Sequence, residues 1–366
     1  KVYGTRRSLS RLFAGRRALT GKKEDPPPSL EFYYFRTLIH PMDQAKKAFE
    51  TMNLYGSKRL PFLFVIDFEC RKPVVLPLEK AAGEGIFFDF RGNTNGAPPF
   101  SAPEDSMVFE KYPVSYSDYV KAFELVMAGL HSGNSYLLNL TFPTPVKVNR
   151  NLSEIFCLSR APYKLLFRDA FTVFSPECFV RISNGTISSF PMKGTIDAGL
   201  PNAARLLLED AKEIAEHHTI VDLIRNDLSM IAEAVRVERF RYLEEIRTNH
   251  RHLLQASSVI TGRLSAGWAS QVGSLLQTLL PAGSISGAPK QKTLEIIRRA
   301  EPDERGYYTG ICGIFDGHGL DSAVMIRFIE NTPGGKIFRS GGGITINSNP
   351  ESEYRELIDK VYVPFV

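Results

Sequence analysis

The sequence has few cysteines and no long apolar run. Four cysteines are scattered among 366 residues, at spacings that match neither a zinc site nor a disulfide framework, so we expect reduced thiols. No stretch of about 18 apolar residues occurs, which argues against a membrane span. The first residues also lack the apolar segment of a secretory signal. These absences favour a cytoplasmic protein without a membrane partner.

Acidic residues are absent from residues 1–23, which carry eight lysines and arginines. These charges exceed the formal net charge of +5, so the rest of the chain is slightly acidic. Such a start is compatible with a targeting peptide or a nucleic-acid-binding arm. We expect instead a disordered or artificially appended tail over 1–28, ending at Pro26–Pro28. The body lacks a basic patch interleaved with aromatic residues, so we expect no nucleic-acid partner.

The remaining residues, 29–366, are predicted to form one domain, with a β-rich part at 29–109 and a motif-bearing part at 110–366. An Asn184-Gly185 hairpin is the clearest local prediction. Strands and helices lack a regular β–α–β alternation, which favours an α+β fold with large antiparallel sheets covered by helices. Strands are predicted at 61–69, 86–92, 135–146, 178–190, 309–316, 321–330 and 336–346, and helices at 117–133, 201–234, 288–300 and 351–362.

A lysine stands in the stretch FPMKGT (190–195), where an apolar residue would pack more easily. A neutral amine is nucleophilic, but a lysine with its ordinary pKa is deprotonated only about once in 2,500 at pH 7. Desolvation or a nearby cation can lower that pKa, which makes Lys193 a candidate nucleophile. A surface lysine is the alternative interpretation.

The hairpin register leaves the partner of Lys193 open. A regular two-residue turn pairs Glu177 with Met192 and directs Lys193 to the other face. Pro191 cannot donate to the ladder, so we expect a break nearby, where a bulge could redirect one side chain. Whether Glu177 and Lys193 meet does not follow from the pattern.

Two groups of acids are predicted to lie on helices. Glu209, Glu213 and Glu216 share one helix face, and Glu353 and Glu356 stand one turn apart on another. Carboxylates from two helices suit Mg²⁺, which takes few protein oxygens. A solvated helix face is the alternative for each group. The glycine-rich pieces 282–290 and 340–344 could bring backbone N–H groups close to an anion.

Six motifs, taken in order, resemble those of the chorismate-utilising enzymes. They are SPECF (175–179), PMKGT (191–195), AEHHTIVDLIRND (215–227), SGAPK (286–290), MIRFIE (325–330) and SGGGI followed by ESEYRE (340–356). The resemblance extends from about residue 110 to the end. It implies a single domain of two large antiparallel sheets packed as a sandwich, with helices outside.

The resemblance also implies roles for individual residues. Glu216 and Glu356, with Glu353 beside them, would hold Mg²⁺ against the ring carboxylate of chorismate. Arg327 and Tyr308 would bind the enolpyruvyl carboxylate. The other implied substrate-binding residues are Gly342, Gly343, Thr195 and Lys290, of which Lys290 has a structural role as its alternative.

Lys193 distinguishes the branches of this family. At this place the sequence of anthranilate synthases looks like PIAGT, whereas that of aminodeoxychorismate synthase component I looks like PIKGT. The resemblance therefore favours the second branch, in folate and 4-aminobenzoate biosynthesis, with anthranilate synthase component I as the alternative. In the implied reaction Lys193 attacks ring C2, the C4 hydroxyl leaves with a proton from Glu177, and ammonia adds at C4 and expels the lysine.

Two positions depart from the family pattern. Leu137 stands where isochorismate and salicylate synthases have a water-activating lysine, which disfavours that branch, and where aminating enzymes usually have glutamine. Gln255 stands where a histidine is common. No complete amidotransferase triad is present, so the resemblance implies that a separate glutamine amidotransferase subunit supplies the ammonia.

Overall fold

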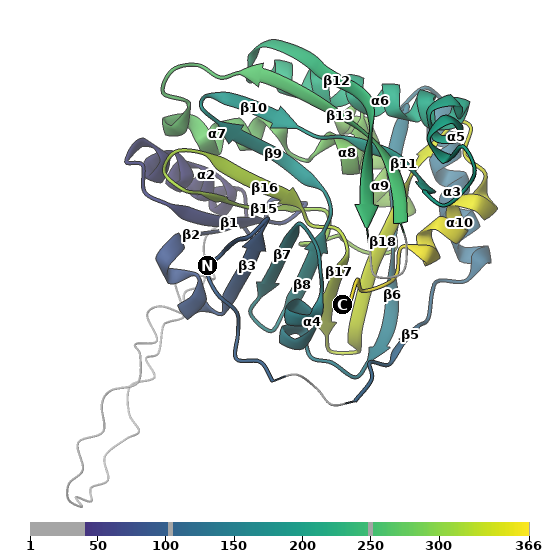
Figure 1. Cartoon of the computed structure of the whole chain (residues 1–366), viewed down its shortest axis with the longest axis horizontal. Helices are drawn as coiled ribbons and strands as arrows, with labels where there is room; N and C mark the ends of the chain where they lie inside the picture. Colours follow the sequence, from purple (N-terminus) through teal and green to yellow (C-terminus); the bar gives the residue numbers. More distant parts are fainter. Residues whose placement is uncertain (1–40, 102–104, 248–251, 366) are drawn as a thin grey trace, which may run out of the picture. The chain divides into compact units, whose positions relative to one another are not determined.

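The computed structural model describes residues 41–101, 105–247 and 252–365. Two nine-stranded sheets make up the fold, and all their strand pairs are antiparallel. Helices lie beside both sheets (Figure 1). The predicted α+β class with two large antiparallel sheets is confirmed. The expected tail, 1–28, lies outside the described residues.

The first sheet carries the predicted hairpin. Its strand order is β11-β13-β10-β9-β16-β15-β1-β2, and β12 pairs with β13. The strands are β1 (Phe62–Ile66), β2 (Val74–Pro77), β9 (Cys178–Ser183), β10 (Thr186–Ser189), β11 (Met192–Asp197), β12 (Glu233–Arg247), β13 (His252–Arg263), β15 (Ile311–Phe315) and β16 (Leu320–Val324).

The second sheet carries the glycine-rich strand. Its order is β14-β6-β18-β17-β8-β7-β3-β4, and β5 pairs with β6. The strands are β3 (Ile86–Phe90), β4 (Asn93–Thr94), β5 (Phe109–Lys111), β6 (Leu137–Val148), β7 (Tyr163–Phe167), β8 (Phe171–Ser175), β14 (Gly287–Ala288), β17 (Phe328–Thr332) and β18 (Gly335–Thr345).

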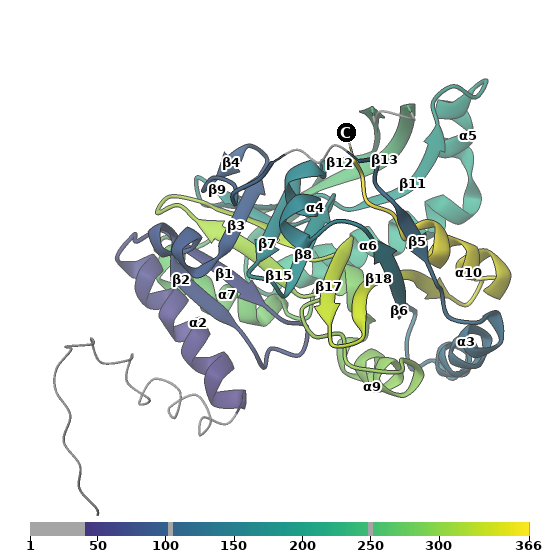
Figure 2. The same cartoon turned by 90° about the horizontal axis from the view of Figure 1, so that it is seen from below.

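Helices cover the sheets in two groups. Helices α2, α6 and α7 pack on the first sheet, and α3, α9 and α10 pack beside β6 and β18 of the second (Figure 2). The α-helices are α2 (Pro41–Ser57), α3 (Tyr116–His131), α4 (Leu152–Leu158), α5 (Ala203–Glu209), α6 (Ala211–Ser229), α7 (Val272–Leu279), α8 (Gly283–Ser286), α9 (Lys290–Ala300) and α10 (Pro350–Asp359), with 3-10 turns at Leu78–Lys80, Ala82–Glu84 and Trp268–Gln271.

Strand β1 shows how the layers are held together. Its five residues, FLFVI, are all buried. Successive side chains of a strand point to opposite faces, so both faces of β1 are covered. Phe62, Phe64 and Ile66 join the core under α2, α6 and α7. Leu63 and Val65 join a second core, to which β3, β7, β8 and β17 of the other sheet contribute. An unbroken apolar run here therefore marks a strand with cores on both faces.

Several segments differ from the sequence predictions, among them the long strands β12 and β13, which were not predicted. Helix α2 was missed, although Ala48, Phe49 and Met52 follow a helical spacing and are buried. The helix predicted at 201–234 is two helices, because Asp210 is extended and its side chain accepts the N–H of Glu213 to begin α6. Glu209 therefore ends α5 and does not share a helix with Glu216.

The strand predicted at 321–330 is also divided. Residues 320–324 form β16 in the first sheet, and residues 328–332 form β17 in the second. Arg327, between them, has φ +53. A positive φ is uncommon in a residue with a side chain, and such strain gathers at functional sites. The chain therefore changes sheets at a residue that the sequence analysis assigns to substrate binding.

The predicted hairpin is confirmed, and it ends before Glu177. Asn184 and Gly185 both have positive φ, as a tight two-residue turn requires. The β9–β10 ladder runs from Ser183–Thr186 to Arg181–Ser188, and β11 then continues on β13 from Met192–Ser257. The regular ladder to Glu177 and Met192 does not form. The break expected at Pro191 is present.

A buried ion pair joins the segments behind the pocket described below. Arg305 is 2% exposed, and its side chain bonds both carboxylate oxygens of Glu301. It also donates to the backbone carbonyls of Ile285 and Asn139. One side chain thus fixes α8 and β6 relative to each other.

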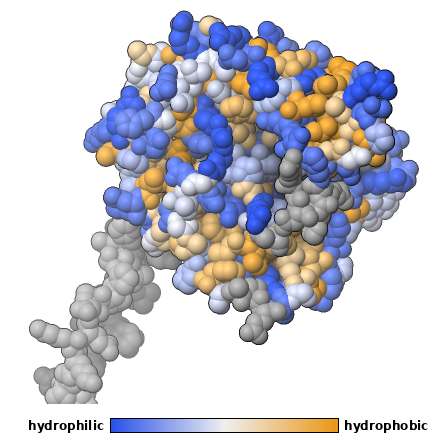
Figure 3. All heavy atoms as spheres, in the orientation of Figure 1, coloured by the Kyte–Doolittle hydropathy of each residue, from blue (hydrophilic) through white to orange (hydrophobic). Residues whose placement is uncertain are grey.

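On the face shown in Figure 3, hydrophilic side chains cover much of the margin, and apolar ones form separate groups. Within the described ranges, none of the helices combines the length and apolarity that crossing a bilayer requires.

Candidate active site

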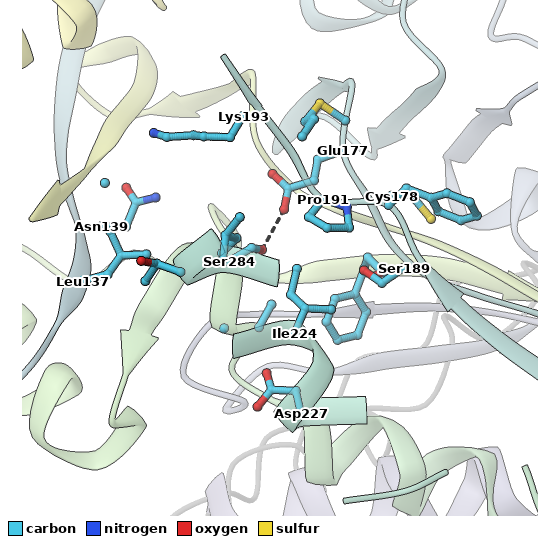
Figure 4. Close-up of a pocket in the computed structure, with 18 of the residues that line it drawn as sticks. Leu137, Asn139, Glu177, Cys178, Ser189, Pro191, Lys193, Ile224, Asp227 and Ser284 are labelled. Carbon is cyan, nitrogen blue, oxygen red and sulfur yellow. Dashed lines mark hydrogen bonds between the residues drawn. The ribbon is translucent and has the colours of Figure 1, made fainter. Parts of the chain in front are cut away.

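A pocket lies where β11, β9, α6 and α8 meet the ends of β6 and β18 (Figure 4). Lys193, Glu177, Glu216 and Gly343 all line it, although they come from distant parts of the sequence. In Figure 4 the side chains of Lys193, Glu177 and Asn139 point toward one common space. Both predicted catalytic residues therefore line the same pocket.

A bulge brings Lys193 to this position. The β11–β13 register shifts between Met192 and Thr195, on either side of Lys193. Gly194 has φ +84, and a Cβ there would lie 3.1 Å from Glu213 Oε2 and 2.9 Å from Leu207 Cδ1. Glycine is needed for both the conformation and the close approach. The extra residue in the bulge directs the lysine toward α6.

A buried histidine holds α6 against the sheet beside this bulge. His217 is fully buried, and its Nε2 lies 2.6 Å from Ser258 Oγ on β13. The N–H of Ser258 in turn donates to the carbonyl of Pro191. Burial, with the charge of Arg241, lowers the pKa of His217 to about 4. At neutral pH the ring is therefore uncharged and serves to join the two elements.

The surroundings of Lys193 favour its ammonium form. Its Nζ lies 2.7 Å from Glu216 Oε2. Burial disfavours the charged form, but the carboxylates of Glu216, Glu356 and Glu213 outweigh it and raise the pKa of Lys193. The lowered pKa that the sequence analysis considered is thus wrong for this arrangement, because desolvation is opposed by an adjacent carboxylate.

Carboxylates from α6 and α10 gather next to Lys193. Lys212 Nζ lies 3.7 Å from Glu216 Oε1 and 3.6 Å from Glu353 Oε1, between the two helices. Glu356 pairs with Lys360, whose Nζ also donates to the carbonyl of Gly341. The alternative of a solvated helix face does not apply to Glu353, which is buried, or to Glu216, whose side chain is 9% exposed, whereas the side chain of Glu356 is 40% exposed.

The charges of these acids are unequal. Burial and the neighbouring Glu356 raise the pKa of Glu353. Burial also opposes ionisation of Glu356, but the ammonium groups of Lys360, Lys193 and Lys212 bring its pKa below the ordinary value. Ionisation of these acids therefore depends on nearby positive charge, which a bound cation would also supply.

The donor set fits a magnesium ion. In the described part of the chain no three His, Cys, Asp or Glu residues are grouped closely enough to hold a metal by themselves. Mg²⁺ is commonly bound through one or two carboxylates plus substrate and water, so Glu216 with an acid of α10 would suffice. Lys212 already places a positive charge between Glu216 and Glu353.

Glu177 is arranged to hold a proton. Its Oε1 accepts a hydrogen bond from Ser284 Oγ at 2.7 Å. Burial raises the pKa of Glu177, although this hydrogen bond and the charges of Lys360 and Arg327 oppose the shift. A carboxyl group that keeps its proton nearer neutral pH is suited to general acid catalysis.

Arg327 lies near this acid, and neither Arg327 nor Tyr308 lines the pocket. Arg327 Nε is buried without a hydrogen-bond partner among the described residues, and its guanidinium lies 5.4 Å from the ring of Tyr362. Burial raises the pKa of Tyr308 to about 12, so its hydroxyl stays protonated. An unpaired buried donor usually signals a missing partner, which suits the predicted anion-binding role of Arg327.

The chain matches, over residues 8–365, the family model described as chorismate binding enzyme. The protein belongs to the chorismate-binding enzyme family. A relative from Haemophilus influenzae, described as an uncharacterized PabA-like protein, is 54% identical over 316 residues, which cover 86% of this chain and 95% of that protein. Aminodeoxychorismate synthase component 1 of Salmonella typhimurium is 35% identical over 259 residues, covering 67% of this chain and 56% of that protein.

Solved structures support the fold of the family. MenF, the menaquinone-specific isochorismate synthase of Escherichia coli, superposes with a TM-score of 0.67 over 87% of this chain and 81% of that protein. The sequence identity is 17%, so this likeness concerns the fold alone. The family membership inferred from six short motifs is confirmed.

The remaining family positions are divided between the pocket and its surroundings. A Cβ on Gly342 would lie 3.5 Å from Glu353 Oε2 and 3.6 Å from Glu356 Oε1, so β18 passes directly beside the acids. Thr195 is exposed and pairs with Gln255 across the sheet, and neither lines the pocket. Lys290 bonds Asp227 and the carbonyl of Leu279, which matches its structural alternative.

Sequence reasoning missed four polar side chains of this chorismate-binding enzyme. They are Ser284, Lys360, Lys212 and Asn139. Lys360 stands four residues after Glu356 and Lys212 four before Glu216, a helical spacing that could have indicated both pairs. Ser284 lies in the glycine-rich stretch, but its contact with Glu177 spans 107 residues and has no local signal.

Proposed function

We propose that this enzyme aminates chorismate at ring C4 to give 4-amino-4-deoxychorismate, as component I of an aminodeoxychorismate synthase that serves 4-aminobenzoate and folate synthesis. The observation that carries the proposal is that Lys193 and Glu177 line one pocket. A nucleophile and an acid facing the same space are what the displacement of a ring hydroxyl requires.

Lys193 is the proposed nucleophile. Its neutral amine forms a bond to C2, the C1–C2 double bond moves to C1–C6, the C5–C6 double bond moves to C4–C5, and the C4–O bond breaks. Its proton must leave first, and the ion pair with Glu216 opposes that loss. Once Glu216 is engaged elsewhere, burial and the nearby ammonium of Lys360 both act to lower the pKa of Lys193.

Glu177 is the proposed acid. It gives its proton to the C4 oxygen, which departs as water, and leaves a carboxylate. Ammonia then bonds to C4, the two double bonds return to C5–C6 and C1–C2, and the C2–N bond breaks to release the neutral lysine. The Glu177 carboxylate accepts a proton from the new ammonium, so Glu177 is again an acid and Lys193 again a neutral amine.

Glu216 and Glu356, with Glu353 beside them, are the residues that would hold Mg²⁺. When bound, the ion would neutralise these acids and the ring carboxylate of the substrate. Arg327 and Tyr308 would hold the enolpyruvyl carboxylate. Leu137 lines the pocket with an aliphatic side chain, which cannot activate water. Its position supports amination over hydration.

The ammonia is proposed to come from a separate glutamine amidotransferase subunit. Ammonium salts should replace that subunit in a test. The enzyme is incubated with chorismate, Mg²⁺ and ammonium, and the products are separated by chromatography. We expect 4-amino-4-deoxychorismate, which a lyase converts to 4-aminobenzoate, and we expect none from Lys193→Ala. Anthranilate as the product, or full amination by Lys193→Ala, would overturn the proposal.

A further inference from the structure

The proposed acid Glu177 depends on a single hydroxyl for its orientation. Ser284 Oγ is its one hydrogen-bond donor within the described residues, at 2.7 Å. Ser284 belongs to α8, a helix of one turn. So short a helix has little stability of its own. The position of Ser284 is therefore set by the contacts that anchor α8.

An ion pair anchors the start of α8. Asp227, at the end of α6, accepts the N–H of Gly283 and the ammonium of Lys290, whose Nζ lies 3.0 Å from Asp227 Oδ2. Lys290 Nζ also donates to the carbonyl of Leu279 at 2.8 Å. The pair thus binds the backbone on both sides of residues 280–282, directly before Ser284.

The packing leaves α8 little room to move. A Cβ on Gly283 would lie 1.9 Å from Leu223 Cδ2 and 2.8 Å from Asp227 Oδ2, so the backbone of α8 lies directly on α6. Arg305 holds the other end through the carbonyl of Ile285. Figure 4 shows Asp227, Ser284 and Glu177 in succession along one side of the pocket.

We propose that Asp227 and Lys290 are positioning residues that hold the hydroxyl of Ser284 on the carboxyl of Glu177. The proposal rests on the role of Glu177 as the acid in the proposed function. It gives a shared role to Lys290 of SGAPK, which does not line the pocket, and to Asp227 of AEHHTIVDLIRND, which does.

Loss of the pair should change the titration of Glu177. The Ser284 hydrogen bond lowers the pKa of Glu177, as do Lys360 and Arg327. The other ionisable groups of the pocket are Cys178, Lys193, Glu216 and Asp227 itself. Loss of the Asp227 charge alone would lower the pKa of Glu177, so an upward shift in Asp227→Asn would report the lost hydrogen bond of Ser284. This shift should be on the order of one pH unit.

The test compares the pH profiles of kcat and the crystal structures of a set of variants. Ser284→Ala should move the limb assigned to Glu177 upward, and Asp227→Asn and Lys290→Met should move it in the same direction. The double variant Ser284→Ala/Asp227→Asn should show no further shift. Lys290→Arg, which keeps the charge, should restore the profile. The control is Asp222→Asn, which removes an exposed pair with Arg225 on the same helix and should leave the profile unchanged.

The crystal structure of Asp227→Asn provides a readout that needs no catalysis. We expect Ser284 Oγ to move beyond hydrogen-bond distance of Glu177 Oε1. The proposal is overturned if that distance is kept, if kcat falls with an unmoved limb, or if the two shifts add in the double variant. If the wild-type protein fails to convert chorismate, the proposed function fails, and the distance in Asp227→Asn still decides whether the pair positions Ser284.

Discussion

Lys193, in the bulge of β11, has its ammonium 2.7 Å from the carboxylate of Glu216. This ion pair holds the proposed nucleophile in its unreactive form. Glu216 therefore controls the reactivity of Lys193 from another element of the fold. Its replacement is the most direct way to observe that control.

Glu216→Gln should make Lys193 more reactive toward an amine-directed reagent. Without the carboxylate of Glu216, burial still disfavours the ammonium of Lys193 and only Glu356 and Glu213 oppose it, so the pKa of Lys193 falls and the neutral amine becomes more abundant at pH 8. Mass spectrometry of the peptide containing Lys193, after timed labelling, measures the rate. Glu209→Gln, on the neighbouring helix α5, is the matched control. An unchanged labelling rate in Glu216→Gln would contradict the prediction.

Glu177→Gln should lower kcat by about 100- to 10,000-fold, the usual range for a lost general acid. KM for chorismate should change little, because glutamine keeps the shape and the contact with Ser284. Steady-state kinetics with saturating ammonium measures both constants. Glu124→Gln, an exposed change on α3, should leave them unaltered. A large rise in KM with normal kcat would assign Glu177 to binding instead.

Mg²⁺ should raise the melting temperature of the protein, because a ligand that binds only the folded state stabilises it. Glu356→Gln should remove most of this rise, whereas Glu351→Gln, exposed on the same helix, should keep it. Differential scanning calorimetry with and without a chelator measures the effect. Equal magnesium responses in the two variants would exclude Glu356 as a ligand.

Acid should weaken the fold through His217. Burial lowers the pKa of this ring to about 4, so between its ordinary value and about 4 the unfolded chain binds more protons than the folded one. The free energy of unfolding contributed by this group is therefore lost as pH falls through that window. Urea unfolding of the wild type and of His217→Gln across pH 4–7 should show a shallower dependence in the variant. Identical pH slopes would contradict this account.

Arg305→Met should destabilise the protein by about 3–5 kcal/mol, because Glu301 would remain buried without its partner. Arg305→Met/Glu301→Leu should recover part of the loss, the rest reflecting the carbonyls of Ile285 and Asn139. Chemical denaturation measures both. Arg298→Met, exposed on α9, is the control. A loss below about 1 kcal/mol in the single variant would show that the pair contributes little.

Much of the site could be predicted because its parts are encoded locally. Pro191 and Gly194 gave the break and the conformational freedom from which a bulge near Lys193 follows. The Asn184-Gly185 turn likewise depends on its own two residues. The separation of α5 from α6 also had a local signal, since Asp210 stands three residues before Glu213 as a helix cap does.

The rest depended on contacts between distant segments. Ser284 and Glu177 are joined only by the folding of α8 onto α6, and no periodicity reports such a pairing. The protonation state of Lys193 also depended on a contact between distant segments. Burial could be anticipated from the flanking strand residues, but the sign of the pKa shift was decided by Glu216, which arrives from another helix.

Lys212 forms ion pairs with two of the acids, Glu216 and Glu353, that a bound ion could displace. Because its long, flexible side chain spans Glu216 and Glu353 from the surface, the two helices are held together before any ion arrives. A divalent ion would have to displace the ammonium of Lys212 from these acids. Its binding affinity would therefore be lower than in the absence of Lys212. We therefore expect the occupancy of the ion site to depend on Lys212, a residue outside the pocket lining.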